Sequence, residues 1–258
     1  MTTPVHFVGA GPGATDLITL RGRRLLDAAD LVVYAGSLVN PELLAGIRAE
    51  CHDSAALDLA AITALLVPAC RADKVVVRLH TGDPSMFGAV REQMRELARL
   101  GIPFELVPGV SSVFAAAAAL KAELTLPEVT QTLILTRLAG RTPMPEREAL
   151  PRLAAIGGSM AIFLSVNMMD KVAADLLAGG VYTKDTPVAV VFRASWPDER
   201  VLRGTLADIA DKVRAAGITR TAMILVGPAL AGMSDAEAAS RLYAADFAHG
   251  FTPNRHKK

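Results

Sequence analysis

The chain has 258 residues, of which 52% are hydrophobic and 21% charged, with 27 Lys and Arg against 26 Asp and Glu. This near balance excludes a generally basic nucleic-acid-binding protein and a generally acidic chain, although it leaves room for a local basic pocket. The length suits one large domain or two small ones, and the high apolar content argues against extensive disorder.

Short β-rich segments alternate with segments of helical periodicity in the first half of the chain. Strands are expected at 5–8, 31–34, 74–79, 104–107 and 133–136. Helices are expected at 16–30, 57–71 and 87–100, with a short helix opening at Pro41 and another capped by Ser111 or Ser112. This alternation is typical of α/β units built on a parallel sheet.

The pattern changes at 139–145, where Gly140, Pro143 and Pro145 indicate a loop or linker. Beyond it, strands are expected at 161–166, 188–192 and 223–226, an edge strand at 201–203, and helices at 168–177, 206–216 and 234–247. We therefore expect two α/β domains, residues 1–138 and 139–258, each a mostly parallel sheet flanked by helices.

Neither a signal peptide nor a membrane-spanning segment is expected. The first residues run directly into a strand pattern, and the longest apolar run, 113–120, is too short to span a bilayer. Cys51 and Cys70 are expected to be reduced thiols, and no Cys/His grouping has the spacing of a zinc site. These features predict a cytoplasmic protein without a bound metal.

Four loops that follow strands are the main candidates for chemistry, because ligands of open α/β sheets bind at the carboxyl ends of the strands. The first, Gly-Ala-Gly-Pro-Gly-Ala at 9–14, formally fits the dinucleotide fingerprint. However, the second strand ends in Tyr34-Ala35-Gly36 without an acid for the ribose, and Pro12 removes a backbone donor. A turn against a neutral or cationic ligand fits better than NAD, and a plain strand-to-helix turn stays open.

The next two loops each allow two interpretations. In the loop that begins at Thr81, Asp83 can accept hydrogen bonds from a ligand's ribose or amino group, or can cap the turn that Pro84 opens. In Pro-Gly-Val-Ser-Ser at 108–112, an ordinary helix N-cap is the simpler interpretation when the loop is taken alone.

The fourth loop, 135–143, carries Arg137 and Arg141 on either side of Gly140 at the expected domain junction. Guanidinium groups bind carboxylates in a forked geometry, so the loop is a candidate for an anionic ligand. A solvated pair of surface charges is the alternative.

Together these loops resemble the tetrapyrrole methylases, the S-adenosylmethionine-dependent C-methyltransferases of sirohaem and cobalamin synthesis. The family-level motifs are Gly-x-Gly-Pro-Gly at 9–13, Gly-Asp-Pro at 82–84 and Pro-Gly-Val-Ser-Ser at 108–112, within a resemblance covering about residues 4–230. Further segments, at 34–39, 80–85, 135–145 and 194–199, resemble the branch that methylates precorrin-4 at carbon 11 of the corrin ring to give precorrin-5.

The resemblance implies a tetrapyrrole methylase fold of two α/β domains with a ligand cleft between them, a homodimer, and S-adenosylmethionine as methyl donor. The residues that match the family's cofactor contacts are Pro12, Thr81, Gly82, Asp83, Met86, Ser111, Ser112, Ser165 and Ala194. The implied substrate is a tetrapyrrole with many carboxylates, for which the candidate partners are Arg137, Arg141 and Arg193, with Arg78 and Arg200 behind them. The sequence shows no obvious catalytic base. His80 is a candidate, and the alternative is that His80 only packs in the interior or stabilises a turn. Catalysis by positioning of the reactants alone is consistent with either role.

Several alternatives remain. Another corrin-ring methylase, a cobalt-precorrin-4 methyltransferase or a uroporphyrinogen III methyltransferase would use the same motifs, and the presence of cobalt in the substrate stays open. The sirohaem branch has Gly in place of Thr81 and Thr-Ala in place of Ser111-Ser112, which weakens the uroporphyrinogen interpretation. A methylase of ribosomal RNA or protein on this fold is opposed for RNA by the balanced charge. A nicotinamide oxidoreductase lacks its ribose acid, and a non-catalytic binding protein is not excluded.

Overall fold

The structure, a computed structural model, describes residues 2–140 and 142–231, and its chain forms two compact units. The first unit contains Met1–Ala119 together with Arg193–Arg200, and the second contains Leu120–Phe192 and Val201–Lys258. The division therefore falls near residue 120, where the sequence predicted 138/139. The physical reason is that strand β6, Leu133–Arg137, pairs with β7 of the second sheet.

The first unit is built on a five-stranded sheet of order β3-β2-β4-β1-β5. Its strands are β1 Val5–Gly9, β2 Leu31–Tyr34, β3 Glu50–Asp53, β4 Val76–His80 and β5 Phe104–Val107. Every neighbouring pair is parallel, so the carboxyl ends of all these strands meet at one edge. Strand β3 was missed from sequence because its Glu-Cys-His-Asp side chains, at the sheet border, carry no apolar alternation.

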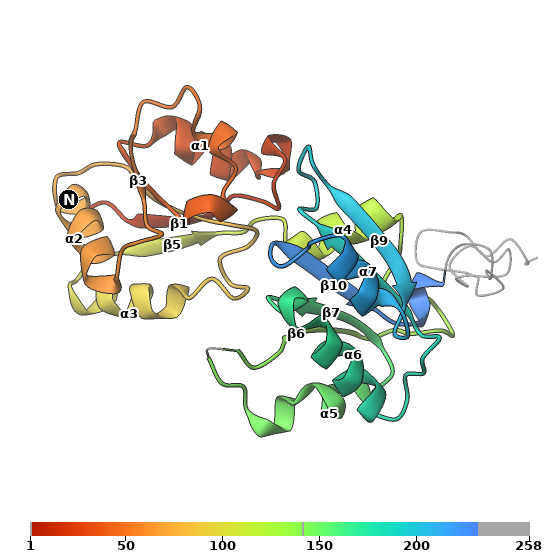
Figure 1. Cartoon of the computed structure of the whole chain (residues 1–258). Coiled ribbons are helices and arrows are strands. Elements are labelled where there is room, and N and C mark those ends of the chain that lie inside the picture. Colours follow the sequence, from red (N-terminus) through yellow and green to blue (C-terminus); the bar gives the residue numbers. More distant parts are fainter. Residues whose placement is uncertain (1, 141, 232–258) are drawn as a thin grey trace, which may run out of the picture. The chain divides into compact units, whose positions relative to one another are not determined.

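Helices cover both faces of this sheet, with α1 on one side and α2 and α3 on the other (Figure 1). Their bounds are α1 Leu20–Ala28, α2 Leu59–Arg71, α3 Val90–Arg99, and, after β5, α4 Ser112–Leu120. The chain leaves β1 toward β2 and leaves its neighbour β4 toward β5, in opposite directions along the sheet. Such a reversal between adjacent parallel strands is where open α/β sheets bind ligands.

The second sheet, of order β6-β7-β10-β8-β9, is mixed. Its further strands are β7 Ser159–Phe163, β8 Pro187–Phe192, β9 Arg200–Thr205 and β10 Ala222–Val226. Strands β6 and β7 are parallel as expected, whereas β10 runs antiparallel to both β7 and β8. The α/β class is confirmed, and β9 lies at the edge as predicted for 201–203. The direction of each strand depends on the connection that leads into it, which the residues of the strand do not reveal.

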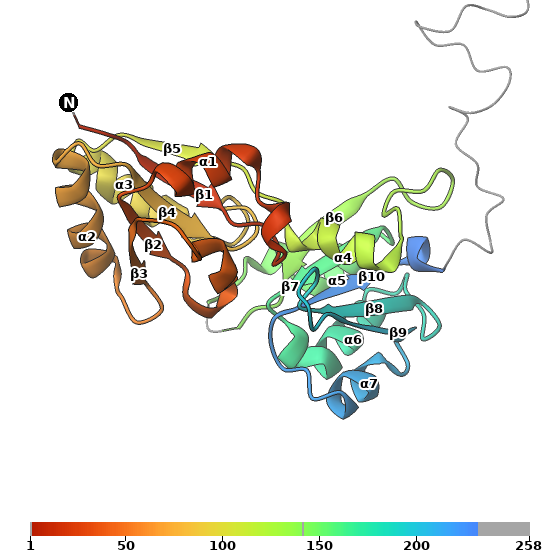
Figure 2. The same ribbon diagram turned by 90° about the horizontal axis from the view of Figure 1, so that it is seen from above.

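One face of the second sheet packs against α5 Leu150–Ala154, α6 Met169–Ala178 and α7 Ile209–Ala215, and Figure 2 shows α6 and α7 on the same side of β8. Short 3-10 segments lie at Thr15–Leu17, Gly36–Leu38, Pro41–Leu44, Glu146–Glu148, Val166–Met168 and Pro228–Leu230. The helix expected at 234–247 falls outside the described residues. Within the described part of the chain, none of the helices has both the length and the apolar character needed to cross a membrane.

Candidate functional site

Three loops meet at the carboxyl edge of β1, β4 and β5, and they pack backbone against backbone. A Cβ atom placed on Gly109 would lie 2.1 Å from the Gly82 carbonyl oxygen and 2.7 Å from the Gly9 Cα. A Cβ on Gly9 would lie 2.5 Å from the Gly109 Cα. Real side chains do not approach backbone so closely, so residues 9 and 109 must be glycine for the loops to meet.

The backbone of the first loop is already hydrogen-bonded within the protein. The Ala10 N–H donates to the His80 carbonyl at 2.7 Å, and Gly11 and Gly82 exchange two N–H···O bonds of 2.8 and 3.3 Å. Both glycines have positive φ, +78° and +60°, which a side chain would strain. Pro12 has no N–H at all, so this loop is poorly suited to the pyrophosphate of a dinucleotide, which needs backbone donors.

Three side chains hold the remainder of that loop. The indole N–H of Trp196 donates to the Pro12 carbonyl at 2.9 Å, and the buried Asn40 amide donates to the Gly13 carbonyl at 2.9 Å. The Ala14 N–H donates to the hydroxyl of Ser195 at 3.0 Å. The turn is therefore fixed by contacts before any ligand arrives.

Asp83 connects the second loop to the third. One carboxylate oxygen accepts the Ser85 N–H at 2.8 Å and the Ser85 hydroxyl, and the other accepts the Gly109 N–H at 2.9 Å. Burial acts to raise the pKa of Asp83, but the hydrogen bonds from Ser85 and Gly109 outweigh it and hold that pKa below its usual range. The geometry thus favours the capping role for the Asp83 side chain, since both its oxygens have protein partners.

Known proteins of one family resemble this chain over most of its length. A sequence profile of the tetrapyrrole (corrin/porphyrin) methylases matches residues 4–210. The chain is 53% identical over 256 residues to a cobalt-precorrin-4 C(11)-methyltransferase of Methanocaldococcus jannaschii, covering 98% of this chain and 97% of the other. It is 51% identical over 250 residues to a precorrin-4 C(11)-methyltransferase of Pseudomonas aeruginosa, covering 96% and 98%.

The chain belongs to the tetrapyrrole methylases.

Solved structures agree with this assignment. A cobalt precorrin-4 methyltransferase superposes with a TM-score of 0.86 at 48% identity, over 89% of this chain and 96% of that one. A uroporphyrin-III C-methyltransferase from Thermus thermophilus, complexed with S-adenosylhomocysteine, superposes with a TM-score of 0.74 at 30% identity, over 89% and 94%. The resemblance drawn from the loop motifs is confirmed at the level of family and fold.

The first unit of this tetrapyrrole methylase contains most of the residues matched to cofactor contacts. They lie in the loops after β1, β4 and β5, at the first residue of α4, or in the returning segment Arg193–Arg200: Pro12, Thr81, Gly82, Asp83, Met86, Ser111, Ser112 and Ala194. The buried Ala194 lies between two residues with positive φ, Arg193 at 46° and Ser195 at 69°. Strained backbone of this kind persists only where surrounding contacts hold it, as at many ligand sites.

Ser165 belongs to the second unit, where its side chain has a local role. It is 0% exposed, its hydroxyl accepts the Leu138 N–H at 2.9 Å, and it donates to the Phe163 carbonyl at 2.7 Å. The hydroxyl therefore has both a donor and an acceptor partner inside the second unit. Its neighbour Leu164 is exposed and has a φ of +55°.

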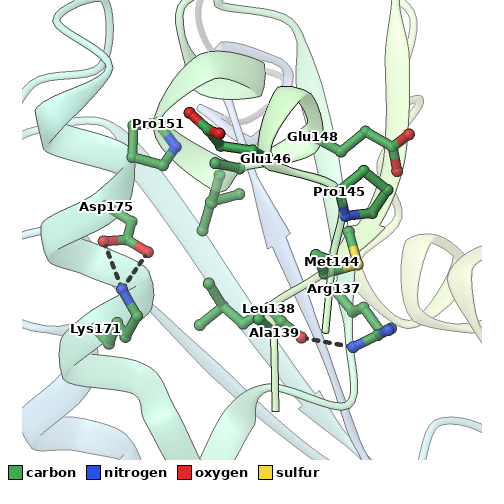
Figure 3. A pocket seen from close by; sticks show the side chains of 12 residues that line it. Arg137, Leu138, Ala139, Met144, Pro145, Glu146, Glu148, Pro151, Lys171 and Asp175 are labelled. Carbon is green, nitrogen blue, oxygen red and sulfur yellow. Dashed lines mark hydrogen bonds and ion pairs between the residues drawn. The ribbon is translucent and has the colours of Figure 1, made fainter. Parts of the chain in front are cut away.

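Arg137, the first of the proposed substrate arginines, supports the loop that follows β6. Its guanidinium donates to the carbonyls of Leu138, Thr142 and Pro143 at 3.0, 3.2 and 3.0 Å. It also lines a pocket of about 300 Å³, whose rim carries the ion pair of Lys171 with Asp175 (Figure 3). Arg141 lies outside the described residues.

The other candidate arginines already have protein partners. Arg193 forms an ion pair with Asp198 at 3.0 Å, and its guanidinium carbon lies 4.0 Å from the centroid of the Trp196 ring. Arg78 is 4% exposed and donates to the Gln93 side chain at 2.9 Å and to a β2 carbonyl, and burial lowers its pKa to about 10. Arg78 is thus part of the first unit's interior, not a surface cation.

His80, the candidate base, is buried beside Phe7, with ring centroids 5.9 Å apart. Burial, and then the charge of Arg78, lower the pKa of His80 to about 3. A neutral imidazole with so low a pKa is a weak proton acceptor near pH 7, so the geometry favours the packed-histidine alternative. The described residues contain no cluster of three His, Cys, Asp or Glu side chains arranged to hold a metal ion.

The sequence motifs do not indicate that Asn40, Ser195 and Trp196 shape the site. A signal for Asn40 was present, because Asn before Pro41 is a typical N-cap, and its side chain accepts the Glu42 N–H at 3.0 Å. The segment 194–199 was noted only as part of a resemblance. Nothing local in the sequence indicates that its indole reaches Pro12.

Proposed function

We propose that the chain transfers a methyl group from S-adenosylmethionine to carbon 11 of precorrin-4, giving precorrin-5. The names of the similar proteins support this activity, and one observation on this chain carries it: in the glycine-packed turn at residues 9–14, the N–H groups of Ala10, Gly11 and Ala14 already donate within the protein and Pro12 has none. Few backbone donors are therefore left for a phosphate, which favours a ligand without one. S-adenosylmethionine carries no phosphate and has a cationic sulfonium, so it fits such a turn.

Pro12, Thr81, Gly82, Met86 and the residues Ser111, Ser112 and Ala194 are the groups proposed to hold the donor, with Asp83 fixing the loops that carry them. When bound, S-adenosylmethionine supplies an already activated methyl group. The protein's contribution is then mainly alignment, because displacement at a methyl carbon depends on the approach of the acceptor more than on acid or base help. The rigid loops after β1, β4 and β5 are suited to that task.

The acceptor carries several carboxylates, and cations near it are expected to come from Arg137 and Arg141. Arg193 is a weaker candidate, since Asp198 already neutralises it. Support for precorrin-4 and for cobalt-precorrin-4 is similar, because relatives named for each substrate are about equally similar in sequence. The test must therefore include both rings.

The decisive experiment is incubation of the protein with methyl-labelled S-adenosylmethionine and, separately, precorrin-4, cobalt-precorrin-4, uroporphyrinogen III and ribosomal RNA. We expect label in the product of one precorrin-4 form, at carbon 11. In parallel, S-adenosylhomocysteine should bind in calorimetry with about micromolar affinity, and NADH should not bind. Label only in uroporphyrinogen or RNA, or binding of NADH alone, would contradict the proposal.

We also propose that the protein acts as a homodimer, as the family resemblance implies, and in the cytoplasm without a metal, as the sequence features predict. Light scattering at micromolar concentration should give twice the 27.1 kDa chain mass. Turnover should survive dialysis against a chelator. A monomer with full activity would contradict the dimer.

A further inference from the structure

The segment Arg193–Arg200 belongs to the first unit, although the chain on both sides of it belongs to the second. It connects β8 to β9 in sequence. Within that unit it contacts the first glycine-rich loop at three consecutive residues, Pro12, Gly13 and Ala14. No role for its tryptophan follows from the methyl-transfer chemistry alone.

The contact between Trp196 and the loop is both polar and steric. The indole N–H donates to the Pro12 carbonyl at 2.9 Å. A Cβ on Gly13 would lie 2.0 Å from Cδ1 and 2.1 Å from Nε1 of the Trp196 ring. The absence of a side chain at residue 13 is therefore what lets the indole lie against the loop.

The segment is itself held in a strained shape. Arg193 and Ser195 both have positive φ, and the Ser195 N–H donates to the Glu199 carboxylate at 2.7 Å. The Arg193 guanidinium covers the Trp196 ring and pairs with Asp198. These contacts hold the short stretch that contains both the indole and the buried Ala194, a proposed donor contact.

We infer that Trp196 is a positioning residue for methyl-donor binding: its indole, seated against Gly13, holds the Pro12 carbonyl and Ala194 in the arrangement that the donor requires. The inference rests on the proposed function, because it assigns Trp196 to the same cofactor site. It predicts that binding of S-adenosylhomocysteine responds to changes at residues 13 and 196 beyond any effect on folding.

The first variant is Trp196→Phe, which keeps an aromatic ring against Gly13 but removes the indole donor. We expect the dissociation constant for S-adenosylhomocysteine to rise about two- to tenfold, as for loss of one hydrogen bond. The matched control is Gly217→Ala in the second unit, where φ is +66° and no atom lies within 4 Å of the added Cβ. That control costs stability through backbone strain but should leave the dissociation constant unchanged.

A double-mutant cycle tests the steric part. Gly13→Ala should weaken binding at least as much as Trp196→Phe, because the new methyl group displaces the indole. In a Trp196→Ala background the same Gly13→Ala change should have little further effect, giving strong non-additivity. Because the chain has a single tryptophan, the emission of the wild-type protein should also change on titration with S-adenosylhomocysteine.

The outcomes separate the two ideas. If the wild-type protein fails to bind S-adenosylhomocysteine, the proposed function is wrong. In that case non-additive effects of the residue 13 and residue 196 substitutions on the free energy of unfolding would still show that the segment Arg193–Arg200 packs against the first loop. If the wild type binds but Trp196→Phe and Gly13→Ala bind equally well, or if the cycle is additive, the positioning role is overturned. Should Gly13→Ala fail to fold, Trp196→Phe against Gly217→Ala decides the question.

Discussion

Two loop regions of this protein bear polar side chains at strand ends, and they are stabilised in different ways. In the first unit, the loops after β1, β4 and β5 are joined by glycine contacts, by paired backbone hydrogen bonds and by Asp83. In the second unit, the guanidinium of Arg137 makes three of the hydrogen bonds that hold the loop after β6, and the Leu138 N–H bond to Ser165 and the Gly140 N–H bond to Thr142 add to them. Asp83 and Arg137 were both candidate ligand contacts, and the side chain of each holds loop backbone through hydrogen bonds.

The difference has an energetic consequence. In the first region many contacts hold the loops together, so the loss of one hydrogen bond lowers stability without separating them, whereas a side chain inserted between the backbones forces them apart. In the second region a single substitution removes every guanidinium bond to the loop. Three changes, ordered by expected effect, sharpen or break this contrast.

The largest effect is expected for Gly109→Ala. The added methyl would lie 2.1 Å from the Gly82 carbonyl oxygen, which is backbone and has little room to move. We expect the free energy of unfolding to fall by about 3 kcal/mol, at the upper end for overpacking. Urea denaturation measures it, with Gly140→Ala as control, because no atom lies within 4 Å of a Cβ there. Equal stability of the two variants would contradict backbone packing as the cause.

Asp83→Asn should have an intermediate effect. An amide can keep one acceptor oxygen but points its NH2 group at a donor, so the variant should lose about 1–2 kcal/mol at pH 7. Because the folded-state pKa of Asp83 is depressed, its contribution is present above the unfolded pKa of about 4 and is lost as pH falls through the folded value. The stability difference between wild type and variant should therefore shrink below about pH 4. A difference that does not depend on pH would contradict the ionised-acceptor role.

Arg137→Lys should have the smallest effect on global stability, about 1 kcal/mol, since an ammonium can serve one or two carbonyls but not span all three. The amides of residues 138–143 should exchange with deuterium faster than in the wild type. If instead the Michaelis constant for the tetrapyrrole rises while exchange in 138–143 is unchanged, Arg137 is a direct carboxylate contact. Lys171→Arg, at the rim of the same pocket, is a charge-conserving control for the exchange measurement.

Much of the fold was predictable because it is encoded locally. The strands at Leu31–Tyr34 and Phe104–Val107 match their predicted ranges, and the glycine and proline motifs correctly marked the loops where β1, β4 and β5 end. Strand β3 was missed because it lacks apolar alternation, and α5 because its five residues are too few to establish a helical period. At the candidate site, the sequence motifs predicted which loops are involved but not which hydrogen-bond partners the individual side chains have.

The sequence by itself determined the α/β class, the family resemblance and the loops that gather at one edge of a parallel sheet, because periodicity and turn chemistry act over a few residues. Only the tertiary structure decided that Leu133–Arg137 joins the second sheet, that β10 runs antiparallel, and that Trp196 lies against Gly13. Those outcomes depend on contacts between segments far apart in the chain. The free energy of such a contact depends on both segments together, so the sequence of one segment alone does not predict the contact.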